Sequence, residues 1–127
     1  HISFIFIKVN KNKKKNDYKL FYQKLFDTVF NQIELNMREL GHGDVTVNKN
    51  MKFLVKSFYS ILLFCENYNK KRKEYKRTFF NQYLKSNINK KAANYDNLID
   101  YFHVFQTFCF DLTSDSVLKG EFKFKFN

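Results

Sequence analysis

Apolar side chains recur at spacings of three and four residues along most of the chain, the pattern of helices that bury one face. One long run with this spacing predicts a helix over residues 17–40, and a second predicts a helix over residues 47–68. The side chains expected to face inward are Tyr22, Phe26, Val29, Ile33, Met37 and Leu40, followed by Val47, Met51, Leu54, Val55, Phe58, Ile61 and Leu62. Two matched stripes joined by a short turn predict an antiparallel helical hairpin.

The turn between these helices contains two of the three glycines in the chain, Gly41 and Gly43. A glycine just past the last periodic residue can take the left-handed conformation that closes a helix, and Arg38 suits the negative end of the helix dipole. The second helix could be capped by Thr46, which we favour, by Asn48 or by Asp44.

Three charged residues, Arg38, Glu39 and Asp44, lie in or next to this short turn. Charged side chains packed into a tight helix junction typically fix its geometry through charge-assisted hydrogen bonds. We therefore expect all three to be held by hydrogen bonds around the turn.

Shorter patterns flank the hairpin. Helical spacing continues over residues 74–84 and 95–113, while residues 1–9 are β-branched and aromatic and by propensity alone favour a strand. Residues 121–127 alternate between phenylalanine and lysine, which we interpret as an extended arm packed over the helices, with a partner-binding strand as the alternative.

The chain has no proline and 3 glycines, a composition that favours long helices over an all-β domain. With 127 residues it is large enough for one core. The predicted fold is therefore all-α: a single helical bundle of about five helices with a short extended C-terminal tail. The helix over 47–68 is apolar on most sides, so we expect it at the centre of the bundle.

The formal net charge is +11, from 23 Lys and Arg against 12 Asp and Glu. This excess attracts polyanions such as RNA, the ribosome surface or an anionic membrane leaflet, and charge alone does not choose among them. Residues 11–15 form a basic connector, and the densest basic patch comprises Lys70, Lys71, Arg72 and Lys73. The alternative interpretation is that these lysines simply solvate the surface.

Candidate chemistry is sparse. Cys65 and Cys109 lie in apolar helical patterns, so we expect buried thiols rather than a disulfide. There is no Cys/His spacing for a metal, and His42 with Asp44 offers too few ligands. Nucleophile elbows, catalytic triads and phosphate-binding loops are also lacking. We expect no enzymatic activity, no cofactor and no small-molecule substrate.

The sequence MRELGHGDVTVNK over Met37–Lys49, followed by Phe58-Tyr59, resembles the signature of the ubiquinol-cytochrome c chaperone family. In that family the signature runs Leu-Arg-Glu-Met-Gly, a variable residue, Gly-Asp, an aliphatic, Ser or Thr, Val and Lys, then a helix with Phe-Tyr-Gly. Weaker similarity extends from His1 to Leu118-Lys119-Gly120. The motif residues that this resemblance marks as candidate partner-binding residues are Arg38, Glu39, Gly41, Gly43, Asp44, Lys49, Phe58 and Tyr59.

This resemblance implies that residues 1–9 are helical and that residues 1–127 form one chaperone-like domain, which we expect to be truncated at its N-terminus. It also implies an assembly factor for the cytochrome bc1 complex, with newly made cytochrome b as client. The ribosome, a second assembly factor and peripheral contact with the membrane are further implied partners. The implied location is the cytoplasmic face of a bacterial inner membrane, or the mitochondrial matrix and inner membrane.

The competing hypothesis is a small basic RNA- or ribosome-binding helical domain, in which exposed Tyr and Phe stack on bases beside lysines. Burial of the aromatic residues discriminates between the two, because a buried ring has no free face for a base.

Overall fold

The computed structural model describes residues 1–11, 16–84 and 95–126. These residues form six α-helices and one 3-10 turn and contain no strand, which confirms the predicted all-α class. The elements are α1 (Ile2–Asn10), α2 (Asn16–Glu39), α3 (Asp44–Glu66), η1 (Tyr68–Lys70), α4 (Lys73–Tyr83), α5 (Asp96–Asp111) and α6 (Ser114–Lys119). Most of the connector at 11–15 and of the stretch between α4 and α5 lies outside the described residues.

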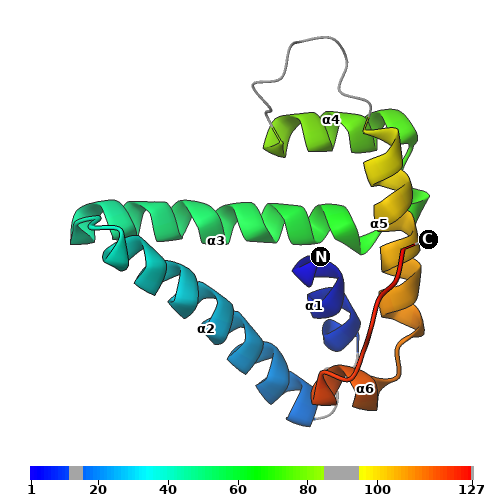
Figure 1. Ribbon diagram of the computed structural model, residues 1–127, viewed down its shortest axis with the longest axis horizontal. Helices are drawn as coiled ribbons and strands as arrows, with labels where there is room; N and C mark the ends of the chain where they lie inside the picture. Colours follow the sequence, from blue (N-terminus) through cyan, green and yellow to red (C-terminus); the bar gives the residue numbers. More distant parts are fainter. Residues whose placement is uncertain (12–15, 85–94, 127) are drawn as a thin grey trace.

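Helices α2 and α3 form the predicted hairpin. They meet at the short turn and diverge from it, and α1 lies between their open ends (Figure 1). The ring centroid of Phe58 in α3 lies 6.0 Å from that of Phe26 and 5.4 Å from that of Phe30, both in α2. The two predicted apolar stripes therefore face each other.

The centre of the fold is α1, and not the helix that the sequence favoured. Its buried residues are Ser3, Phe4, Phe6, Ile7 and Val9, and it packs against α2, α3, α5 and α6. A short helix that is apolar on nearly every side suits such an enclosed position, so packing overrides strand propensity here. By contrast α3 leaves Phe53 and Leu63 each 68% exposed, and the expectation that it is central was wrong.

The same core extends from Phe4 and Ile7 of α1 to the end of α3, η1, α4 and α5. It is built around the buried residues Phe64, Cys65, Tyr68, Phe80, Ile99, Phe105 and Cys109. The two cysteines are free, as expected, and burial raises the pKa of each thiol to about 11. Such thiols remain protonated and unreactive near neutral pH.

Beyond α5 the structure contains α6, a helix that the sequence analysis did not predict. The Thr113 hydroxyl accepts a hydrogen bond from the Ser116 amide at 3.1 Å and so caps α6. Gly120 ends it with a φ of 68°. Residues 121–126 then run along α5 as an extended arm (Figure 1), with the Phe124 ring 5.0 Å from that of Phe105. The interpretation of residues 121–127 as an arm packed over the helices is confirmed for these six.

Candidate partner-binding site

The hairpin turn is tighter than expected because α3 begins early. Gly41 adopts a φ of 84° and ends α2, and its amide donates to the carbonyl of Arg38 at 2.9 Å. Gly43 is extended and occupies the N-cap position, where no side chain accepts a hydrogen bond. The predicted cap at Thr46 was wrong, because the chain is helical from Asp44 onwards and Thr46 already lies in the first turn.

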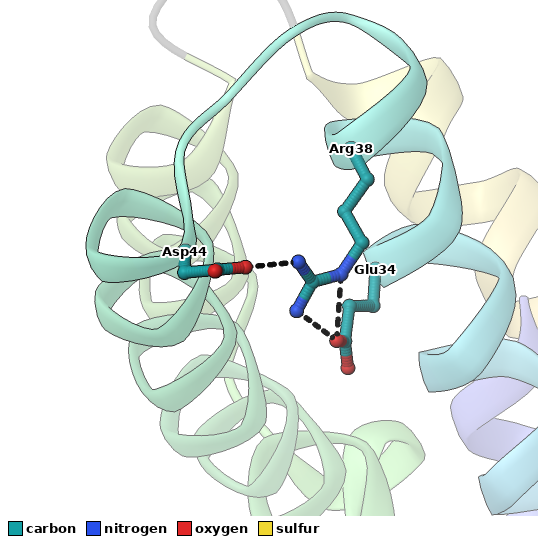
Figure 2. Close-up of polar contacts among 3 residues, drawn as sticks. All are labelled: Glu34, Arg38 and Asp44. Carbon is teal, nitrogen blue, oxygen red and sulfur yellow. Dashed lines mark hydrogen bonds and ion pairs between the residues drawn. The ribbon is translucent and has the colours of Figure 1, made fainter.

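One ion pair, Arg38–Asp44, holds the turn across the two helices, and a second, Arg38–Glu34, lies within α2. The Arg38 guanidinium donates to the Asp44 carboxylate and to Glu34, whose Oε1 lies 2.8 Å from Nη2 and 3.1 Å from Nε (Figure 2). The hydrogen bonds to Asp44 and Glu34 raise the pKa of Arg38. The expectation of hydrogen bonds was therefore correct for two of the three charged residues.

The Glu39 side chain makes no hydrogen bond or ion pair within the described part of the chain, so that expectation was wrong. The acid that binds Arg38 instead is Glu34, which was not predicted from the sequence. It lies four residues before Arg38, the spacing at which oppositely charged side chains meet on a helix.

Around this fixed geometry the turn exposes apolar side chains. Leu40 is 78% exposed and Val45 is 84% exposed. Leu40 was expected to face inward, but it follows the last residue of α2 and lies outside the helical contact with α3. We call Leu40 and Val45 the hairpin tip.

The other motif residues divide into two groups. Gly41 and Phe58 contribute to the hairpin itself, since Gly41 ends α2 and the half-buried Phe58 packs with its ring 5.4 Å from that of Phe30 in α2. Glu39, Lys49 and Tyr59 lie exposed to solvent. The exposed members of the signature are therefore free to contact a partner.

The basic patch is partly occupied by contacts within the protein. Lys73 lies 3.2 Å from Asp96 Oδ2, and the Nζ of Lys71 lies 5.3 Å from the ring centroid of Tyr75. Lys70 and Arg72 are exposed and have no acidic partner among the described residues. Two of the four side chains thus remain available to an anionic partner.

Asp96 joins α5 to α4 and should make stability sensitive to acid. Arg77 donates from Nε and Nη2 to its two oxygens, both at 2.8 Å, and these bonds together with Lys73 lower the pKa of Asp96 from 3.8 to about 2. A depressed carboxyl pKa stabilises the fold above the unfolded value, so this contribution is lost as pH falls from about 4 to about 2. We predict that the melting temperature of Asp96→Asn falls less steeply across that window than the melting temperature of the wild type.

The matched control is Asp115→Asn, which removes an exposed acid paired only with Lys119 of its own helix. Thermal melts followed by circular dichroism between pH 5 and pH 2.5 would test this. If the melting temperature of Asp96→Asn fell with pH as steeply as that of the wild type, the prediction would be contradicted.

Within the described ranges, no group of three or more His, Cys, Asp or Glu side chains could hold a metal ion. Over the same residues, no helix is both long and apolar enough to cross a membrane.

Comparison with known proteins identifies the family. No curated protein and no solved structure matches the chain. A family model described as ubiquinol-cytochrome C chaperone matches residues 1–124, nearly the whole sequence, and so covers α1 to α6 as well as the hairpin turn. The chain therefore belongs to the ubiquinol-cytochrome C chaperone family.

Proposed function

We propose that this protein is an assembly factor for the ubiquinol-cytochrome c reductase (bc1) complex and that it holds newly synthesised cytochrome b at the hairpin tip. Membership of the family supports a chaperone role with a client in that complex. The observation that supports this site is that the turn combines ion-paired ends with exposed apolar side chains. Arg38 ties its two ends together, while Leu40 and Val45 are almost fully exposed.

A fixed apolar tip suits an apolar client. A side chain on a preformed turn loses little conformational freedom on binding, so more of the free energy of burial appears as affinity. Burying a leucine or a valine contributes about 1.5–3 kcal/mol. Segments of a membrane protein that have not yet reached their partners offer the apolar surface that such a tip requires.

Few features of the described residues favour the alternative, an RNA-binding domain. Among the described aromatic residues, those exposed are Phe53, Tyr59, Tyr75, Tyr83 and Phe126. The others pack against the helices, and Tyr75 already has Lys71 against its ring. Base stacking needs free ring faces beside free cations, and few remain outside α3, where Phe53 and Tyr59 lie among exposed lysines. We also propose the ribosome and a second assembly factor as partners. The proposed location is the periphery of the membrane, on its cytoplasmic or matrix side.

Capture of in vitro translated cytochrome b by the immobilised chain tests this proposal. We predict that Leu40→Ser with Val45→Ser lowers capture at least about tenfold, because two apolar contacts are lost. Wild-type capture should persist when salt is raised, since burial of apolar area is barely screened. The control is Leu20→Ser with Val104→Ser, two residues 55% and 44% exposed on other helices, which should capture normally.

Equal capture by the tip variant and the control would contradict the proposal. A second variant, Lys70→Gln with Arg72→Gln, tests charge. If it lost the client at both low and high salt, charge rather than the tip would hold cytochrome b. Retention of RNA by the wild type at high salt, with quenching of tyrosine fluorescence, would favour the RNA-binding alternative.

A further inference from the structure

One face of α3 carries no packed neighbour along most of its length. The residues of this outer face are Lys49, Lys52, Phe53, Lys56 and Leu63, all exposed, with the exposed Tyr59 at its edge, where its ring lies 6.2 Å from that of Phe26 in α2. At 3.6 residues per turn they fall within about a third of the helix circumference and extend for about 21 Å. The opposite side of α3, with Val47, Phe58 and Cys65, packs against the rest of the protein.

The outer face combines uncompensated positive charge with large apolar groups. None of its three lysines forms an ion pair with a described residue. The two acids of α3, Asp44 and Glu66, are its first and last residues, so none lies between the lysines. Phe53 and Leu63 are each 68% exposed and Tyr59 is 47% exposed.

A comparison with α2 shows that this composition is particular to α3. The exposed side of α2 carries amides and balanced charges, because its exposed cations Lys19, Lys24 and Arg38 are matched by the exposed acids Asp17, Asp27 and Glu39. Two helices of one hairpin, 24 and 23 residues long, thus present chemically different surfaces. A general excess of lysine in the chain would have placed unbalanced positive charge on both helices.

We propose that the outer face of α3 docks on an anionic lipid surface. Lysines can hold their charged ends at lipid phosphates while their stems and the neighbouring aromatic and aliphatic side chains lie against the apolar boundary, so a face of this composition suits a membrane interface. The lysines reach lipid phosphates while Phe53 and Leu63 enter the acyl boundary, and the amphipathic ring of Tyr59 suits the headgroup level. Val45 of the hairpin tip lies on the same side of α3, one turn before Lys49, so this face adjoins the client site proposed above but does not depend on it.

The experiment is flotation of the protein with vesicles of phosphatidylcholine, alone or mixed with phosphatidylglycerol. We expect the wild type to float with the anionic vesicles and not with the neutral ones. The variant Lys49→Gln, Lys52→Gln, Lys56→Gln should bind about a hundredfold more weakly, from roughly fivefold per lysine at an anionic surface. The variant Phe53→Ser, Leu63→Ser should lose the binding that remains at high salt.

A control of equal charge separates this face from net charge. The variant Lys19→Gln, Lys24→Gln, Lys125→Gln removes three exposed lysines from α2 and the C-terminal arm, and it should bind like the wild type. Equal loss in both triple variants would overturn the proposal, as would equal binding to neutral vesicles. Binding of RNA or of an acidic peptide through α3 without binding to vesicles would overturn it too.

A spectroscopic variant reports on the face directly. The chain contains no tryptophan, so Phe53→Trp introduces a single reporter at an exposed position. Its emission should shift to the blue with anionic vesicles, while Val104→Trp on α5 should not shift. Emission from Phe53→Trp that vesicles leave unchanged would place the membrane contact elsewhere and overturn the proposal.

Discussion

Replacing Phe6 with alanine is expected to lower the free energy of unfolding by about 3–5 kcal/mol. The Phe6 side chain is completely buried, and its ring centroid lies 4.8 Å from that of Tyr22 and 5.1 Å from that of Phe58. It is therefore the contact through which α1 joins α2 to α3 where the hairpin opens (Figure 1). Truncation leaves a void between three helices, and the loss is a large fraction of the ordinary stability of a domain.

Urea unfolding followed by circular dichroism measures this effect. Phe53→Ala is the matched control, because it removes the same ring from a position 68% exposed and should change stability by less than about 0.5 kcal/mol. If the two variants unfolded at the same urea concentration, α1 would not be the centre of the fold.

The hairpin could be predicted from the sequence because its signals are local. Apolar spacing shows where a helix has a buried stripe, and Gly41 shows where that helix stops. Contacts such as that between Phe30 and Phe58 then follow from two matched stripes separated by a short turn. The same reasoning predicted the buried cysteines and the extended arm.

The central position of α1 could not be predicted in this way. Apolar spacing reports how hydrophobic a segment is, whereas the number of helices that surround it depends on contacts between distant parts of the chain. In α3 the predicted inward stripe left out Phe53 and Leu63, but the apolar character of most of the helix favoured a central position, in which these two exposed residues would have been covered. The proposed lipid-binding face became visible only once the packed side was known.

Two other features that differ from expectation have local signals in the sequence. A threonine that can cap a helix, followed seven residues later by a glycine that can end it, is a local helix signal. Helix α6 lies between two such residues, Thr113 and Gly120. At the turn, the Asp44 carboxylate could accept hydrogen bonds either from helix amides or from a guanidinium. Arg38 is oriented toward it by Glu34, a contact that depends on how two helices meet.

Tyr68 should be the second position with a large effect on stability. It is 1% exposed, and its ring lies edge to face with Phe4 and with Phe64 at centroid distances of 5.7 and 5.8 Å. The Nζ of Lys76, itself a largely buried residue, lies 4.3 Å from the centroid of the same ring. Tyr68→Ala removes all of these contacts and leaves Lys76 without its aromatic partner, so we expect a loss of about 3–5 kcal/mol.

Tyr68→Phe separates the hydroxyl from the ring. The hydroxyl donates to the Ile99 carbonyl at 3.2 Å, and burial raises the pKa of Tyr68, so the group stays a donor at any working pH. Phenylalanine retains the ring packing and the contact with Lys76, and we expect it to cost about 0.5–1.5 kcal/mol. Tyr75→Ala, at a ring 57% exposed in the neighbouring helix, is the control and should cost less than either. If Tyr68→Phe destabilised the protein as much as Tyr68→Ala, the hydrogen bond to Ile99 rather than the ring would hold η1 against α5.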